Sequence, residues 1–226
     1  MKDLFLSYGI EISDEQLLKF RKYYELLISY TEKFNITAIT DEIDVYKKHF
    51  VDSILGAKLI SSGSLIDIGS GGGFPAIPLK IICENLSITL VEATGKKCEF
   101  LRAVIKELGL VNIGVVNDRA ELLAKIDNYR ENFDYCTARA VARLNTLAEY
   151  CMPFVKVGGE FIAFKGDATD EVIESKNAIK VLGGELKEVV NYNLDDAKRA
   201  LVVVKKVKPT DKKYPRGNGK ERKNPL

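Results

Sequence analysis

The stretch that decides the fold is Leu65-Ile66-Asp67-Ile68-Gly69-Ser70-Gly71-Gly72-Gly73-Phe74-Pro75, in which a short apolar run leads directly into a cluster of glycines. Glycine allows the backbone to approach a ligand closely, and proline is favoured in the first turn of a helix. The unpaired N–H groups at the start of that helix can hold a polar or anionic group. The stretch therefore predicts a buried strand, a ligand-binding loop and a helix in succession.

Outward from this loop, short apolar runs alternate with helical segments. The predicted strands are 65–68, 88–91, 113–116, 133–137 and 160–164, and the predicted helices are 75–83, 94–108, 121–125 and 143–155. Such alternation indicates βαβ units and a parallel sheet that is buried on both faces. The last two predicted strands, 185–192 and 200–206, are joined by too few residues for a crossover helix, so they must pair in antiparallel fashion.

These elements together predict a Rossmann-like α/β fold with a seven-stranded, mostly parallel sheet whose last strand is antiparallel. That arrangement is typical of class I methyltransferases, whereas the sheet of a nucleotide dehydrogenase continues in parallel. The first 60 residues are helical in pattern instead, and Ser13 and Gln16 have the spacing of a capping box. We expect an N-terminal helical extension at 1–60, a ligand-binding domain at 61–206 and a basic C-terminal tail at 207–226.

Composition and charge exclude several classes of protein. No stretch approaches the roughly 20 apolar residues that span a bilayer, and the N-terminus lacks the pattern of a signal peptide. The four cysteines are scattered and the chain has one histidine, so we expect no metal site and buried thiols in a reducing cytoplasm.

The net charge is +2, but residues 205–226 hold nine Lys or Arg and two acids. Such a tail favours a polyanionic partner, the alternative being a solvated, disordered tail.

The glycine loop differs from a dinucleotide-binding loop at one position. The strict dinucleotide pattern requires glycine at position 74, where this chain has Phe74. The bulky side chain suits a ligand with a small carboxylate and amine, such as the methionine end of S-adenosylmethionine. Glu92 ends the next strand, about 20 residues beyond the loop, where an acid can accept hydrogen bonds from ribose hydroxyls. The sequence thus predicts a loop and an acid that bind one nucleoside together.

The third predicted strand is followed by Asn117-Asp118-Arg119-Ala120-Glu121, a loop that lies beside the adenine in this fold. Asp118 could accept from the adenine amino group, and the backbone of Ala120 and Glu121 could line the ring. A helix-capping role for Asp118 explains its position equally well.

The residues after the fourth strand bear on the chemistry. The segment has no Asn-Pro-Pro-aromatic motif, which disfavours methylation of an exocyclic amine. Cys136 lies within the apolar strand and is better explained as a structural thiol than as a nucleophile for cytosine C5. Arg139 suits a phosphate or the O6 and N7 edge of guanine, the alternative being a salt-bridging arginine. Guanine N7 has a free lone pair, so its methylation needs alignment but no general base.

Several basic residues are candidate contacts to an RNA backbone, although solvated side chains would fit the same pattern. They are Lys96, Lys97, Arg143, Lys165, Lys213 and Arg216. We expect the C-terminal tail to bind phosphates and to be dispensable for cofactor binding. His49 is the single histidine, and in a helical segment it is more often a core or capping residue than a catalyst.

Taken together, the sequence resembles the ribosomal RNA small-subunit methyltransferase G family, also called glucose-inhibited division protein B. The resemblance rests on segments 34–40, 49–53, 67–75, 96–101, 118–121, 137–142 and 213–216, which read FNITAIT, HFVDS, DIGSGGGFP, KKCEFL, DRAE, TARAVA and KYPR. Ala76 stands where many members have glycine.

This resemblance implies S-adenosylmethionine-dependent N7 methylation of one guanine in the 530 loop of bacterial 16S ribosomal RNA. The cofactor contacts that follow from the motifs and the resemblance are Gly69, Ser70, Gly71, Phe74, Glu92, Ala93, Thr94, Asp118, Ala120, Glu121 and Arg139. The RNA partner is expected within the small ribosomal subunit, and the enzyme is expected to be a cytoplasmic monomer. The rival hypotheses are a methyltransferase for another RNA base, a dinucleotide-dependent oxidoreductase and a non-catalytic RNA-binding module.

Overall fold

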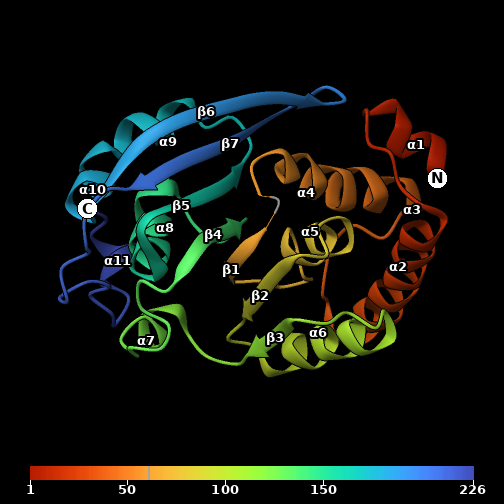
Figure 1. Cartoon of the computed structure of the whole chain (residues 1–226), viewed down its shortest axis with the longest axis horizontal. Helices are drawn as coiled ribbons and strands as arrows, with labels where there is room; N and C mark the ends of the chain where they lie inside the picture. Colours follow the sequence, from red (N-terminus) through yellow and green to blue (C-terminus); the bar gives the residue numbers. More distant parts are fainter. Residues whose placement is uncertain (61) are drawn as a thin grey trace.

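A computed structural model describes residues 1–60 and 62–226, and it is built around one seven-stranded sheet (Figure 1). The strand order is β3-β2-β1-β4-β5-β7-β6, with β7 antiparallel to both of its neighbours. The strands are β1 Gly63–Ile68, β2 Leu86–Val91, β3 Ile113–Val116, β4 Phe133–Arg139, β5 Val155–Lys165, β6 Gly184–Leu194 and β7 Ala197–Lys206. The predicted mostly parallel sheet with an antiparallel end is confirmed.

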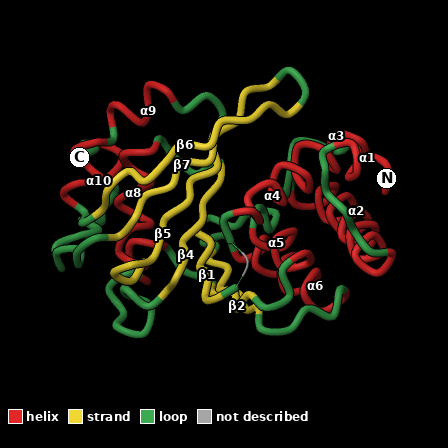
Figure 2. The backbone as a smooth tube through the Cα atoms, turned by 45° about the horizontal axis from the view of Figure 1, so that its top comes forward, coloured by secondary structure: helices red, strands yellow, loops and turns green. Residues whose placement is uncertain are grey.

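Helices cover both faces of this sheet (Figure 2). They are α1 Lys2–Ser7, α2 Asp14–Phe34, α3 Glu42–Val45, α4 Asp52–Ile54, α5 Ala76–Ile82, α6 Gly95–Glu107, α7 Ala120–Leu123, α8 Leu144–Cys151, α9 Thr169–Glu174, α10 Lys176–Val181 and α11 Lys220–Lys223. Successive residues of the central strand β1 enter different cores. Leu65 packs with the N-terminal helices, α5 and α6, while Ile66 packs with α8 and α10. This two-sided burial explains the continuous apolar runs of the strands.

Some element boundaries differ from the sequence-based prediction. The predicted helix 143–155 ends as α8 at Cys151 and is followed by a short helical turn at Met152–Phe154, after which β5 begins at Val155. Helices α9 and α10 between β5 and β6 were not predicted. Helix α9 contains no buried residue, so its sequence carries no apolar periodicity. The proposed domain boundary at residue 61 lies outside the described residues.

The N-terminal helices share an aromatic core with the glycine loop. The capping box at the start of α2 is present as predicted. The Ser13 hydroxyl accepts from the Gln16 backbone N–H, and the Gln16 side-chain oxygen accepts from the Ser13 backbone N–H. From α2, Tyr23 stacks on Phe74 at 5.5 Å between ring centroids, and its hydroxyl donates to the Gly72 carbonyl. Tyr23 also stacks on Phe50 at 5.1 Å. The loop backbone therefore rests directly on the N-terminal helices.

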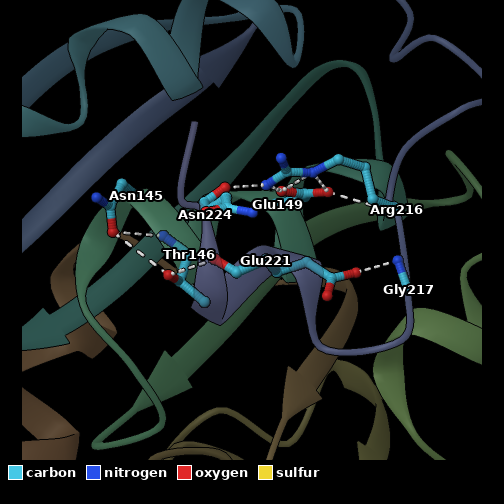
Figure 3. A network of polar contacts seen from close by, with 7 residues as sticks. All are labelled: Asn145, Thr146, Glu149, Arg216, Gly217, Glu221 and Asn224. Atoms are coloured by element: carbon cyan, nitrogen blue, oxygen red, sulfur yellow. Dashed lines mark hydrogen bonds and ion pairs between the residues drawn. The ribbon is translucent and has the colours of Figure 1, made fainter.

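The C-terminal tail is docked on the body of the protein rather than solvated (Figure 3). Glu149 of α8 is fully buried and accepts hydrogen bonds from the Arg216 backbone N–H at 2.8 Å and from its Nε and Nη2 at 2.9 and 2.7 Å. Arg130 donates to three backbone carbonyls of the tail, those of Thr210, Asp211 and Tyr214. The disordered alternative for the tail is therefore wrong, because its backbone polar groups have partners on the body.

The Arg216–Glu149 pair should make a measurable contribution to stability. Replacing Arg216 by alanine should lower the free energy of unfolding by about 3–5 kcal/mol, because it leaves the Glu149 carboxylate buried without a counter-charge. Urea unfolding measures this change. Lys213→Ala is the matched control: Lys213 and its partner Asp211 are 64% and 57% exposed, so the expected change is within about 0.5 kcal/mol. Equal losses in both variants would contradict the assignment.

Candidate functional site

The glycine loop between β1 and α5 has a backbone that only glycine tolerates. Gly69 and Gly73 have φ angles of 68° and 88°, in the left-handed region. A Cβ added to Gly69 would lie 2.7 Å from Val141 Cγ2, and one added to Gly73 would lie 2.6 Å from Ile77 Cδ1. The loop therefore packs closely against the segment that follows β4 and against the helix α5. The rest of its surface is open to a ligand.

Glu92 lies beside this loop at the end of β2, as the sequence predicts. One carboxylate oxygen accepts from the Gly71 N–H at 2.9 Å, and the other accepts from the Thr94 N–H at 2.8 Å. The side chain is 7% exposed. Because each carboxylate oxygen accepts more than one hydrogen bond, Glu92 retains acceptor capacity for ligand hydroxyls.

A cavity of about 330 Å³, the first cavity, opens between the glycine loop and the ends of β2 and β3. It is lined by Ile68, Gly69, Val91, Glu92, Ala93, Asp118, Arg119, Ala120, Glu121, Val141, Tyr150, Gly219 and Arg222. Six of the predicted cofactor residues meet there: Gly69, Glu92, Ala93, Asp118, Ala120 and Glu121. Tyr150, Gly219 and Arg222 were not predicted. The lining fits a nucleoside, since the carboxylates of Glu92, Asp118 and Glu121 offer acceptors for hydroxyl or amino groups.

The other predicted cofactor residues surround this cavity without lining it. Gly71 and Thr94 hold the Glu92 carboxylate through their backbone. Ser70 is buried and its hydroxyl donates to the Asp67 carbonyl, at 3.1 Å. Phe74 and Arg139 lie together on the other side of the loop, where the guanidinium carbon is 4.9 Å from the ring centroid.

A second cavity, of about 340 Å³, lies between the N-terminal helices and the ends of β4 and β5. It is lined by Ile39, Lys48, His49, Asp52, Arg139, Ala140, Phe164, Lys165, Gly166, Glu171 and Arg199. Ala140 lines this cavity and its neighbour Val141 lines the first one. The segment after β4 therefore separates two adjoining cavities, and four of the second cavity's residues are Lys or Arg.

Arg139 joins the two parts of the site. Its Nη1 donates to Asp52 Oδ2 at 3.1 Å and to the Lys48 carbonyl at 3.2 Å. Its Nη2 lies 3.0 Å from His49 Nδ1. Arg139 thus makes the salt bridge that the sequence left open as an alternative, while its 14% exposed side chain still reaches the second cavity. Its contact with a cofactor remains a prediction.

His49 is held as a neutral ring with a defined tautomer. A guanidinium can only donate, so Nδ1 must accept from Arg139, and Nε2 then donates to Thr37 Oγ1 at 2.8 Å. Burial, assisted by the Arg139 charge, lowers the pKa of His49 to about 3. The ring also stacks on Phe74 at 4.4 Å. With both nitrogens engaged, His49 supports the loop and does not act as a base.

Two further groups near the site are sequestered. Asp67 at the end of β1 is fully buried, and its Oδ1 accepts from Thr137 Oγ1 at 2.7 Å. Burial raises the pKa of Asp67 to about 7. Cys136 is also fully buried, and burial raises the pKa of its thiol well above the usual value. A buried neutral thiol is a poor nucleophile, which agrees with its interpretation as a structural residue.

Most of the predicted RNA contacts have partners within the protein. Lys96 lies over the Phe34 ring at 5.0 Å. Arg143 pairs with Glu174, and Lys165 pairs with Glu171 at 2.7 Å. Arg216 is bound to Glu149, whereas Lys213 is largely exposed, and Lys97 is half-buried on α6. Within residues 1–60 and 62–226, no group of three or more His, Cys, Asp or Glu side chains is arranged so that it could hold a metal ion. Over the same residues, no helix is long and apolar enough to cross a bilayer.

The depressed pKa of His49 makes stability depend on pH with a definite sign. The unfolded chain takes up a proton near pH 6.5, while the folded ring stays neutral to about pH 3. Stability is therefore present above pH 6.5 and is lost as the pH falls toward 3, by about 1.4 kcal/mol per pH unit. His49→Asn should remove this loss.

Unfolding titrations of wild type and His49→Asn at pH 4.5, 5.5 and 6.5 measure the difference. The comparison is needed because the raised pKa of Asp67 acts with the opposite sign in the same range, making the folded state more stable as the pH falls. Parallel pH profiles for the two proteins would show that His49 titrates normally in the fold.

Comparisons with known proteins agree on one family. The sequence model of the family described as rRNA small subunit methyltransferase G matches residues 16–202. The ribosomal RNA small subunit methyltransferase G of Acetivibrio thermocellus is 45% identical, over 97% of this chain and 92% of its own length. The protein of the same name from Clostridium beijerinckii is 47% identical, over 96% of this chain and 94% of its own length.

Solved structures with much lower identity share the fold. A SAM-dependent methyltransferase from Aquifex aeolicus has a TM-score of 0.56 at 15% identity, covering 75% of this chain and 96% of that one. A protein from M. jannaschii in complex with AdoMet has a TM-score of 0.55 at 14% identity, covering 69% of this chain and 77% of that one. These neighbours confirm the predicted class I methyltransferase fold, and the family match extends over most of the chain. The chain therefore belongs to the ribosomal RNA small subunit methyltransferase G family.

Proposed function

We propose that the protein transfers a methyl group from S-adenosylmethionine to N7 of one guanine in the 530 loop of 16S ribosomal RNA. Membership of the family supports the reaction and the cofactor. The observation that carries the assignment of roles is the pair of adjoining cavities on either side of the segment after β4. The first cavity has the acids that a nucleoside needs, and the second has the cations that a nucleotide of RNA needs.

In the first cavity, Glu92 would accept from the ribose hydroxyls, because its two oxygens are already aimed by the Gly71 and Thr94 N–H groups. Asp118 would accept from the adenine amino group, with the backbone of Ala120 and Glu121 along the ring. Bound S-adenosylmethionine supplies an electrophilic methyl group on a sulfonium. Because glycine at position 69 lets the loop pack closely against Val141, the methionine end would lie on the remaining surface of the loop.

In the second cavity, Arg139 has donors left for a substrate. Three of its five N–H groups are used by Asp52, Lys48 and His49 among the described residues, which leaves two. Guanine offers O6 and N7 as acceptors, and O6 would take an Arg139 donor while N7 faces the methyl group. Lys48 and Arg199, also on this cavity, would hold flanking phosphates.

Guanine N7 carries its own lone pair, so the protein does not have to remove a proton before transfer. The neutral His49, with both nitrogens engaged, agrees with such a site. The work of the protein is then to align N7 and the methyl group and to exclude water between them. Methylation of another RNA base remains the alternative.

The wider RNA contact would involve Lys165, which lines the second cavity, and the predicted contacts Lys96, Lys97, Arg143 and Lys213, with Arg216 fixing the tail. The substrate is ribosomal RNA by family, and we propose the small subunit or its assembling form as the partner. A cytoplasmic monomer is consistent with this role.

The product identifies the reaction. After borohydride reduction, aniline cleaves RNA at 7-methylguanine, so ribosomal RNA from the source organism should show one such cut in the 530 loop. The cut should disappear when the gene is deleted and return with the wild-type gene.

Arg139→Lys should not restore the cut fully, since an ammonium cannot hold Asp52, His49 and a ligand at once. Arg102→Ala, an exposed arginine on α6, is the matched control and should restore it. A cut that persists after deletion, or a lost methyl group on cytosine or adenine, contradicts the proposal.

The role of Glu92 is tested by cofactor binding alone. Glu92→Ala should weaken binding of S-adenosylhomocysteine by about 1–3 kcal/mol, because ribose hydroxyls lose their buried acceptor. Isothermal titration calorimetry measures the change. Glu99→Ala, an exposed acid on α6, should leave the affinity unaltered. If Glu92→Ala binds as tightly as wild type, Glu92 does not contact the nucleoside.

A further inference from the structure

The C-terminal tail reaches the first cavity and forms part of its wall. Gly219 and Arg222 line that cavity together with Asp118, Glu121 and Tyr150. Gly219 is followed immediately by α11, which carries Arg222. A segment about one hundred residues beyond the β3 loop therefore closes the same space as Asp118 and Glu121.

Buried polar contacts fix this part of the tail (Figure 3). Glu221 is fully buried, its carboxylate accepts from the Gly217 N–H, and its carbonyl accepts from Thr146 Oγ1 at 3.0 Å. Thr146 belongs to α8, which also supplies Glu149 for Arg216. The next residue of α8, Tyr150, lines the first cavity. One helix thus anchors the tail and forms the cavity, so their relative positions are set by α8.

Arg222 is the exposed basic residue that this anchoring brings to the cavity. Its neighbour Glu221 is held in the interior, so the helix presents Arg222 outward, beside the acids Asp118 and Glu121. Burial raises the pKa of the Tyr150 phenol, which lines the cavity together with Arg222. The two residues therefore form neighbouring parts of the cavity lining.

We propose that residues 217–222 are a wall of the S-adenosylmethionine pocket and that Arg222 contacts the purine of the cofactor. The proposal rests on the placement of the adenine beside Asp118, Ala120 and Glu121. A guanidinium is a planar group of N–H donors, so it can donate in the plane of the purine to one of its ring nitrogens. The tail is then a cofactor-binding element, in contrast to its predicted role as an RNA-binding appendage that cofactor binding does not need.

Calorimetry on the full chain without RNA tests this role. Arg222→Ala should weaken S-adenosylhomocysteine roughly tenfold, the equivalent of one hydrogen bond from a charged donor. It should weaken 5′-methylthioadenosine by the same factor, because that ligand keeps the purine and lacks the amino-acid end. Lys223→Ala, the adjacent exposed residue outside the cavity, should change both affinities by less than about twofold.

Unchanged affinity of Arg222→Ala for both ligands would overturn the proposal. So would a loss seen for S-adenosylhomocysteine alone, which would place Arg222 at the amino-acid end. A loss shared equally by Lys223→Ala would indicate general charge rather than contact. None of these results depends on which RNA base is methylated, so the guanine N7 assignment stands or falls separately on the mapped cut.

Discussion

The buried carboxylate of Asp52 holds three distant parts of the chain in one arrangement. It accepts from Arg139 at the end of β4 at 3.1 Å and from the Tyr192 hydroxyl of β6 at 2.8 Å, and Arg199 of β7 lies 3.5 Å away. A carboxylate that is 4% exposed is strongly destabilising without partners, so these groups must converge. That convergence fixes the position of the N-terminal helices, of Arg139 and of the second cavity.

The aromatic contacts transmit this arrangement to the glycine loop. Phe74 lies between the His49 ring and Tyr23, with Arg139 over its face. The bulky residue that departs from the dinucleotide pattern is therefore the loop's contact with the N-terminal helices. A loop supported in this way is already shaped before a ligand arrives, which lowers the entropic cost of binding.

Local patterns predicted most of the fold and the centre of the nucleoside site. Strand burial, the capping box and the spacing of Glu92 from the loop are all properties of neighbouring residues. The Asp52 contacts were not predictable in that way, because Asp52 and Arg139 are 87 residues apart and no periodicity links them. The docking of the tail was not predictable from its excess charge for a related reason. Glu149 and Glu221 neutralise and bury part of it, and the sequence does not indicate which acids face which cations.

The Asp52 contacts also set the order in which a nascent chain can fold. Asp52 leaves the ribosome 140 residues before Tyr192, which at about 5–20 residues per second is a delay of about 7–28 s. During that time the first helices can form locally, but their buried carboxylate lacks its partners from β6 and β7. The last hairpin to be synthesised completes the core around the first helices. A ribosome that pauses late in this message would therefore display an N-terminal region that is helical but not yet closed.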